Sequence, residues 1–299
     1  MDYYVAWTHS DPIFQQYLPD AKVLVSPPNV SLSWQIRQWP SLPKALIVDS
    51  GAYQYYREGR RPLPQELLAR QLRVLGNCTV VCGFCHLDVP MLGTRNVAVL
   101  DRRVSENLEH ARWLAHHIGV EGLPANVELL GVIQGYSVET VFYTAQSLAD
   151  MGYTRFALGS LAKMSSSNKS ELLRRVEAAL EAVGPTVHIL GVSSVTLLRR
   201  LAQIGVQSAD SGAPVHEAWR GGLYYSQPFR RYKVPSPHFS EWIRSYGFAE
   251  ILPAPLPCDC PVCLHDSQRL LEPQGKEYVN LRAVHNYYHL VRELQVAAP

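Results

Sequence analysis

The chain has 299 residues, of which 47% are hydrophobic and 18% charged, enough to bury two ordinary domains or one barrel-sized domain. Its net charge of +2 excludes a strong global field for nucleic acid or membranes, so any such surface must be local. No run of about 18 apolar residues could span a bilayer. The N-terminus lacks the pattern of a signal peptide, so a cytoplasmic protein without membrane contact is expected.

Eight short apolar runs predict β-strands, in chain order at 3–7, 22–26, 45–49, 78–88, 127–135, 155–160, 187–192 and 205–210. Amphipathic stretches at 64–76, 102–119, 137–152, 170–184 and 194–205 have helical spacing, and each ends at a glycine. Strands and helices in alternation predict a parallel sheet, and eight strands suit a closed (β/α)₈ barrel over residues 1–251. A doubly wound open sheet is the alternative, which the lack of a Gly-x-Gly-x-x-Gly or P-loop motif disfavours.

Six of these runs carry a polar residue or a glycine at the C-terminal end of their apolar part: Asp49, Asp88, Gln134, Gly159, Gly191 and Asp210. In a barrel the carboxyl ends of the strands form one rim, which holds the active site. A single strand-end aspartate commonly caps the next helix. Three carboxylates beside a glutamine and tight glycine turns favour a shared functional site instead.

Carboxylates without a neighbouring lysine, histidine or phosphate loop indicate glycosidic-bond chemistry. One aspartate would attack the anomeric carbon and another would handle the proton, with a covalent glycosyl-enzyme between two half-reactions. The glutamine and the glycine turns offer hydrogen-bond donors and close backbone approach for a flat polar base or a sugar.

These residues lie in motifs that resemble the tRNA-guanine transglycosylases. The segment DSGAYQ is similar to the family's DSGGFQ, and GVIQG, LGSLA, LGVSS and ADSG resemble its later strand-end motifs in the same order. CDCPVC with the later NLRAVHNYY resembles its zinc site, and the order holds from about residue 45 to residue 290. The family is a (β/α)₈ barrel with a zinc subdomain that exchanges guanine in a polynucleotide for a 7-deazaguanine base.

The resemblance implies a role for each matching position. Asp210 is the nucleophile at C1′, and Asp49 is the general acid and base. Asp88 and Gln134 recognise the edge of the base, the backbone of Gly159, Ser160 and Leu161 contacts it, and Gly191 leaves room near it. Tyr53 stands where the family has phenylalanine, which adds a hydroxyl beside the base pocket.

Other departures concern the substrate. Ser160 replaces a family glycine, KMSSS stands where Gly-Glu usually follows, and PVHEAWRGG replaces the basic run after the nucleophile. These changes slightly favour the DNA-modifying branch of the family over enzymes that modify tRNA. The resemblance also covers non-catalytic partner subunits, although both aspartates are present here. A homodimer or a partner from the modification pathway is compatible with it, and a small-molecule glycoside hydrolase is a further enzyme alternative.

The six cysteines fall into two triplets, which favours metal over disulfides. The resemblance implies that Cys258, Cys260, Cys263 and His285 bind a structural Zn²⁺, with His289 as a rival ligand one helical turn later. A Cys₃His set leaves no open coordination position, so the zinc should anchor a C-terminal element at 252–299. The other triplet, at 78–85, has spacing similar to iron–sulfur sites of radical SAM enzymes, but an apparent buried strand favours buried thiols.

Two stretches predict contact with nucleic acid. Residues 219–233, WRGGLYYSQPFRRYK, interleave aromatic side chains with four basic ones, and they follow the predicted nucleophile directly. The segment YYREGRR at 55–61 follows the predicted acid and base. Basic groups would hold phosphates and aromatic rings would stack a splayed strand. The basic candidates are Arg220, Arg230, Arg231 and Lys233.

Overall fold

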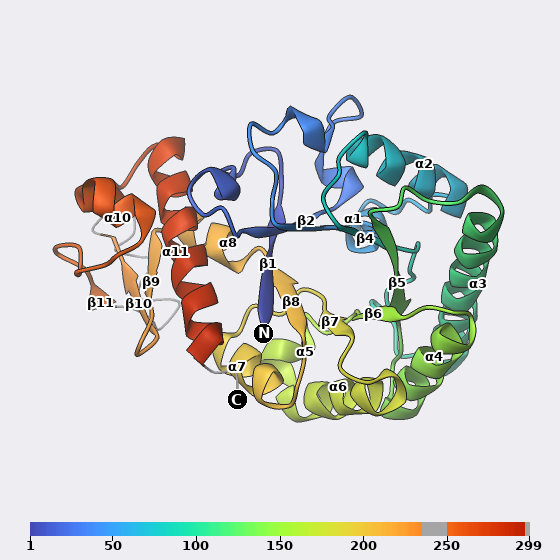
Figure 1. Cartoon of the computed structure of the whole chain (residues 1–299). Coiled ribbons are helices and arrows are strands. Elements are labelled where there is room, and N and C mark those ends of the chain that lie inside the picture. The colour runs from blue at the N-terminus through green and yellow to red at the C-terminus, as the bar shows by residue number, and fades with distance from the viewer. Residues whose placement is uncertain (235–249, 297–299) are drawn as a thin grey trace.

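The structure is a computed structural model that describes residues 1–234 and 250–296. Its centre is a closed barrel of parallel strands in sequential order, with helices around the outside (Figure 1). Strand β8 closes onto β1, from Asp2 opposite Ser208 to Val5 opposite Ser211. The barrel confirms the (β/α)₈ prediction and excludes the open sheet. Its strands are β1 (Asp2–Trp7), β2 (Lys22–Val25), β3 (Ala45–Val48), β4 (Cys82–Cys85), β5 (Val127–Ile133), β6 (Arg155–Leu158), β7 (Val187–Ile189) and β8 (Ser208–Ser211).

Side chains alternate between the barrel interior and the helical layer. One buried cluster inside the barrel contains Tyr4, Leu24, Ile47, Cys85, Leu130, Val132 and Ala157. The residues between them belong to the larger cluster that the helices cover, such as Val48 and Phe84. Because both faces of each strand are buried in this way, continuous apolar runs mark the strands, and strict apolar–polar alternation does not.

The helices that flank the barrel are α1 (Ala52–Arg57), α2 (Pro64–Leu75), α3 (Val97–Glu121), α4 (Val138–Asp150), α5 (Met164–Ser167), α6 (Lys169–Val183), α7 (Val195–Gln203) and α8 (Ala213–Trp219). Short 3₁₀ turns are η1 (Phe14–Gln16), η2 (Pro27–Asn29) and η3 (Ile36–Gln38). Within the described residues, no helix has the length and apolarity that a bilayer crossing requires.

Helices α2 and α6 end at the predicted glycines, Gly76 and Gly184. The predicted end of α3 at Gly119 was wrong, because that helix continues to Glu121. Gly122, not Gly119, adopts a positive φ of 74°, and its N–H donates to the carbonyl of Ile118. Two glycines stand three residues apart, and the second one takes the positive φ at which the helix ends.

A small unit follows the barrel strands. Strands β9 (Gly222–Tyr225), β10 (Arg230–Lys233) and β11 (Glu250–Ile251) form a sheet outside the barrel, followed by α10 (Pro261–Asp266), η4 (Ser267–Leu271) and the long α11 (Lys276–Val296). Helix α11 runs beside α8 and β1 (Figure 1). Its Tyr287 hydroxyl accepts from the backbone N–H of Lys22 at 3.0 Å and donates to the carbonyl of Tyr3 at 3.2 Å. Residues 235–249 of the predicted barrel domain and 297–299 of the predicted C-terminal element lie outside the described residues.

Candidate active site and metal centre

Three carboxylates converge at the carboxyl-end rim of the barrel. Asp49 directly follows β3, Asp88 lies three residues beyond β4, and Asp210 lies in β8. The thiol of Cys85, inside the barrel, has a pKa raised first by burial and then by the charges of all three carboxylates. The rim therefore gathers the acidic residues that the sequence predicted to be neighbours.

Asp88 and Gln134 form one hydrogen-bonded network. Gln134 Nε2 donates to Asp88 Oδ2 at 2.5 Å, and Ser50 Oγ donates a short bond to Asp88 Oδ1. Gln134 Oε1 accepts from Ser160 Oγ at 2.7 Å, and Ser160 Oγ accepts from the N–H of Met91 at 2.9 Å. The hydroxyl of Ser160 thus fixes which way the Gln134 amide points.

The backbone at residues 159–160 is shaped around that amide. A Cβ on Gly159 would lie 2.3 Å from Gln134 Nε2, so a side chain there would displace the Gln134 amide from its network. Ser160 adopts a positive φ of 60°, a conformation that costs a non-glycine residue about 1–2 kcal/mol. Its two hydrogen bonds offset that cost, and Leu161 beside it is fully buried.

Asp49 is held in a way that suits a proton carrier. Its Oδ2 accepts from Ser26 Oγ and from the N–H of Gly51, each at 3.0 Å. Burial raises the pKa of Asp49, the Gly51 bond opposes the shift, and the charge of Asp210 adds to it. A carboxyl with a raised pKa holds its proton at higher pH than an exposed aspartate does.

Asp88 is buried, and its pKa is raised to about 7. Burial is the main cause and the charge of Asp49 is the second, while the bonds from Ser50 and Gln134 oppose the shift. The protein stabilises the neutral carboxyl relative to the ionised one. Asp88 therefore changes its charge near neutral pH.

Asp210 has a partner that the sequence analysis missed. Its Oδ1 accepts from the N–H of Gly191 at 3.1 Å and lies 3.2 Å from His188 Nε2. Gly191 has a positive φ of 71°, which explains the glycine at this turn. Strand period could have found His188, because Val187 and Ile189 pack outward and the residue between them must face the barrel interior.

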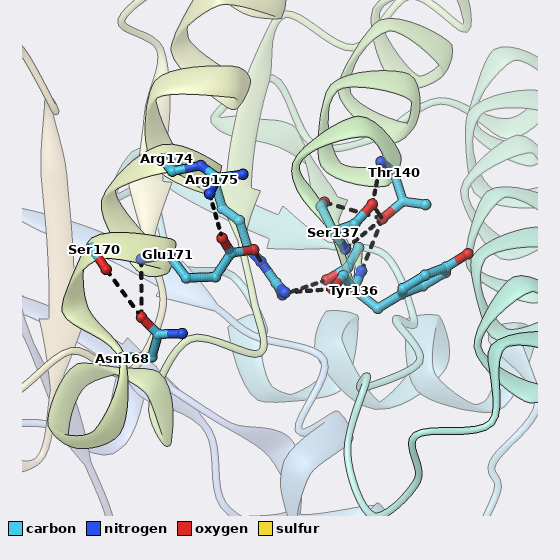
Figure 2. A network of polar contacts seen from close by, with 9 residues as sticks. Tyr136, Ser137, Thr140, Asn168, Ser170, Glu171, Arg174 and Arg175 are labelled. Atoms are coloured by element: carbon cyan, nitrogen blue, oxygen red, sulfur yellow. Dashed lines mark hydrogen bonds and ion pairs between the residues drawn. The ribbon is translucent and has the colours of Figure 1, made fainter.

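The loop that follows Gln134 is fixed from outside the barrel. Figure 2 shows Arg175 of α6 reaching this loop, where it donates to the carbonyls of Gly135, at 3.2 Å, and of Tyr136. Glu171 Oε1 accepts from Arg175 Nε at 3.0 Å. The guanidinium holds both the loop and its own helix, so the position of Gln134 does not depend on β5 alone.

Tyr53 is exposed on α1, four residues after Asp49. The four predicted basic residues lie apart from the rim cluster. Arg220, Arg230, Arg231 and Lys233 belong to the edge of α8 and to the outer sheet, beside α11 (Figure 1). Arg231 and Lys233 pair with buried Glu217, at 2.7 and 3.1 Å. Burial alone would raise the pKa of Glu217, but these two cations outweigh it and lower that pKa.

A cavity of about 320 Å³ adjoins Asp88. It lies between α1, the segment 59–64, the turn 87–90 and α3. Arg60 stacks over the ring of Tyr55 and Arg103 over that of Tyr56, with 5.4 and 5.8 Å between guanidinium carbon and ring centroid. Aromatic and basic groups from the predicted 55–61 stretch therefore line a hollow next to the rim.

The second predicted centre is also assembled. The ligand atoms of Cys258, Cys260, Cys263 and His285 lie within 4.8 Å of one another, although the cysteines precede the histidine by more than twenty residues. His285 Nε2 donates to the carbonyl of Tyr224 at 2.8 Å, which leaves Nδ1 facing the sulfurs. A second hydrogen bond of this kind orients metal-binding histidines. The four residues form a buried Cys₃His cluster that could hold a metal.

His289 has a different role from His285. Its Nδ1 accepts from the backbone N–H of Ser226 at 3.1 Å, so the ring proton of the neutral side chain sits on Nε2. That Nε2 lies 3.1 Å from Cys258 Sγ. His289 therefore donates an N–H to a sulfur of the cluster and has no ring lone pair left for a metal.

The other cysteine triplet is embedded in the barrel wall. Cys82 and Cys85 lie in β4, and Cys78 is buried just before it. Burial raises the pKa of Cys82 and of Cys85 well above the usual range of a thiol. A strand of this kind cannot wrap a cluster in the way that iron–sulfur ligand loops do.

The fold and the site define this protein as a (β/α)₈-barrel protein that has acidic residues at its rim and an attached Cys₃His cluster. A model of the queuine tRNA-ribosyltransferase family matches residues 95–297, about two thirds of the chain, and the chain belongs to that family. It is also similar to a DNA-guanine transglycosylase from Salmonella montevideo, with 26% identity over 124 residues. That match covers 38% of this chain and 30% of the relative, so the chain spans less than a third of the relative's length.

Proposed function

We propose that this protein exchanges guanine in a polynucleotide for a 7-deazaguanine base through a covalent intermediate on Asp210. The observation that carries the proposal is the pairing of two unlike carboxylates at one rim. Asp210 is held by donors on Oδ1, whereas Asp49 has a raised pKa that the charge of Asp210 helps to cause. Such a pair suits a nucleophile beside an acid and base.

Both half-reactions use the same two residues. Asp210 forms a bond to C1′ while the bond from C1′ to guanine N9 breaks, and the departing guanine takes a proton from Asp49. The incoming base then loses its N9 proton to Asp49 and attacks C1′, which breaks the ester and restores the carboxylate. Protons and charges balance over the cycle, and no hydrolytic water is consumed.

Base recognition is assigned to the network beside Asp49. The carboxylate of Asp88 accepts from the N–H groups of a guanine-like edge, and Gln134 donates to its carbonyl. The backbone of Gly159, Ser160 and Leu161 lines the base, Gly191 leaves room for it, and Tyr53 covers it. The fixed amide of Gln134 supports this assignment, because its Nε2 already points toward Asp88.

The raised pKa of Asp88 predicts weaker base binding below neutral pH. Ionised Asp88 accepts two hydrogen bonds from the base, and this form is lost as pH falls through about 7. Guanine affinity should therefore fall up to about tenfold for each further pH unit, which equilibrium dialysis with labelled guanine at pH 6, 7 and 8 would measure. The stability of the fold depends on pH in the opposite direction from base binding. Because folding raises the pKa of Asp88, its contribution to stability is largest at low pH and is lost as pH rises through about 7.

Asp88→Asn is the matched control, since it keeps the size of the side chain and removes its titration. Its guanine affinity should be low and independent of pH from 6 to 8. Wild-type binding that stays constant over the same range would exclude Asp88 as the group that reads the base.

DNA is the polynucleotide that we favour, and tRNA is the alternative. The similarity to a DNA-guanine transglycosylase supports DNA, while the matched family carries the name of a tRNA-modifying enzyme. Labelled guanine exchange into duplex DNA, single-stranded DNA and tRNA in parallel separates them, with Asp210→Asn as the blank. We expect label in DNA and less in tRNA. Binding without exchange into any of the three would instead point to a non-catalytic partner subunit.

We propose that the polynucleotide runs over the cavity next to Asp88, which residues of the 55–61 stretch line, and over the outer sheet of β9, β10 and β11. Arg220 and Arg230 are exposed there, whereas Arg231 and Lys233 already neutralise Glu217. Arg230→Ala should therefore weaken nucleic-acid binding and flatten the log–log salt slope by about one unit.

Arg231→Ala is the comparison variant for this prediction. Removing Arg231 takes a partner from buried Glu217, so it should lower the melting temperature, an effect that Arg230→Ala should not share. A salt slope for Arg230→Ala equal to that of the wild type would place the phosphate contacts elsewhere.

The Cys₃His cluster is proposed to bind Zn²⁺ through Cys258, Cys260, Cys263 and His285. Three thiolates and one imidazole suit zinc and close its coordination, so the ion would supply folding energy and not catalysis. We propose that the described part of the predicted C-terminal element, residues 252–296, is what the ion stabilises, beside the outer sheet of β9, β10 and β11 that follows the barrel strands.

A further inference from the structure

His188 lies in the barrel interior, one residue layer further from the rim than Asp210. It is 3% exposed and pairs in register with Ser208 of β8. Ser208 and Asp210 are two residues apart on one strand, so both face the same side. The imidazole reaches from β7 to both, and the ring of Tyr4 packs edge-on against it with 5.4 Å between centroids.

The hydrogen bonds around this ring fix its orientation. His188 Nδ1 lies 2.9 Å from Ser208 Oγ, and Nε2 lies 3.2 Å from Asp210 Oδ1. A carboxylate only accepts, so Nε2 carries the proton and donates to Asp210. A serine hydroxyl can donate, so it supplies the proton shared with Nδ1. The chain from Ser208 through His188 to Asp210 is complete with a neutral imidazole.

The two oxygens of Asp210 are therefore unequal. Gly191 N–H and His188 Nε2 both donate to Oδ1. Within residues 1–234 and 250–296, the hydrogen bonds that reach this carboxylate all end on Oδ1. Oδ2 keeps its lone pairs for another partner.

We propose that His188 is a positioning residue for Asp210, one that directs Oδ2 to the sugar carbon and sets how much enzyme is held as the covalent ester. The proposal rests on the transglycosylase function proposed above. In the first half-reaction Oδ2 bonds to C1′ as guanine leaves with its electron pair. Oδ1 becomes the ester carbonyl and keeps both donors. In the second half-reaction the electrons of the breaking bond from Oδ2 to C1′ return to the carboxylate.

The donor from His188 favours the free carboxylate over the ester. A hydrogen bond to a charged acceptor is about twice as strong as one to a neutral carbonyl. Removing the donor therefore shifts the balance between free enzyme and covalent adduct toward the adduct. The shift should be roughly fivefold, the difference expected between a charge-assisted and a neutral bond. A variant that is only less well folded would lose adduct and turnover together.

The test measures the amount of adduct against the concentration of free guanine. Enzyme and saturating guanine-containing DNA or tRNA, whichever the wild type exchanges, are equilibrated at a series of guanine concentrations. The mixtures are denatured in acid, and the covalent complex is quantified on a gel. The readout is the guanine concentration that halves the amount of adduct, called the half-point below, together with kcat and KM for exchange.

Substitutions at His188 separate the donor from the shape of the ring. His188→Phe keeps a flat ring and removes the donor, so the half-point should rise roughly fivefold while kcat falls about 10–100-fold with little change in KM. His188→Gln keeps an amide N–H and should bring the half-point back toward the wild-type value. Ser208→Ala removes the group that fixes the ring and should move the half-point in the same direction by a smaller factor.

A second buried histidine provides the control. His86 follows β4 and bonds Asn107 and the backbone of Val132, away from Asp210. His86→Gln should lower the melting temperature and leave the half-point unchanged. If His188→Phe folds and its half-point equals that of the wild type, the proposal is overturned. If that variant does not fold, the half-point of Ser208→Ala decides in the same way. A wild type that neither exchanges guanine nor forms adduct overturns the proposed function itself.

Discussion

Replacing Asp210 by asparagine is expected to lower guanine exchange by at least about 10⁴-fold, the scale of losing a nucleophile. The amide cannot form the glycosyl ester, because it lacks the charged oxygen that attacks C1′. Exchange of labelled guanine into polynucleotide, measured with excess enzyme over hours, would register the loss.

Asparagine is a sharper test than alanine at this position. Asp210 is buried, and it accepts from Gly191 and His188. Alanine would leave those two donors without an acceptor, whereas asparagine can still accept on its carbonyl oxygen. The melting temperature of Asp210→Asn should therefore stay near that of the wild type. Exchange at a wild-type rate would remove Asp210 as the nucleophile.

Replacing Cys260 by serine is expected to cause the largest loss of stability. Cys260 is fully buried in the Cys₃His cluster. A structural zinc site contributes apparent binding free energy of about 10–16 kcal/mol, as large as the whole net stability of a typical domain. The variant should lose about one zinc per chain and melt at least about 10 °C lower. Metal analysis and thermal unfolding measure the two effects.

The controls for this prediction come from within the chain. Cys78→Ser changes another buried cysteine, one outside the cluster, and should keep the metal. His285→Ala should lose the metal, whereas His289→Ala should keep it with about 10–100-fold weaker affinity, because His289 only supports a ligand. Full stability of the metal-free protein would contradict a structural role.

Much of the barrel was predictable because its strands are short apolar runs that end in recognisable residues. Asp49, Gln134 and Gly159 follow the strand ends directly, and parallel topology alone brings them to one rim. The Cys₃His cluster was predictable from spacing and resemblance. His285 is distinguished from its rival His289 by the carbonyl of Tyr224 and the N–H of Ser226, which are contacts across 61 and 63 residues.

The missed features depend on contacts between distant elements. His188 sits in an apolar strand just before the LGVSS motif and outside it, and its contact with Asp210 appears only when β8 lies beside β7. The pairing of Arg231 and Lys233 with Glu217 likewise depends on the turn of the outer sheet. The sequence shows the positive charge of these residues but not that Glu217 already neutralises it, so the prediction that they bind phosphates counted too many cations. The end of α3 was predicted wrongly because the sequence offers two glycines, Gly119 and Gly122, as its C-terminal cap.

Trapping the covalent intermediate tests the central claim most directly. Wild-type enzyme is mixed with guanine-containing polynucleotide without free base, denatured in acid, digested and analysed by mass spectrometry. We predict a sugar adduct on the peptide that carries Asp210, and its loss when guanine is added before denaturation. Exchange that proceeds with no adduct, or with an adduct on another residue, would contradict the account.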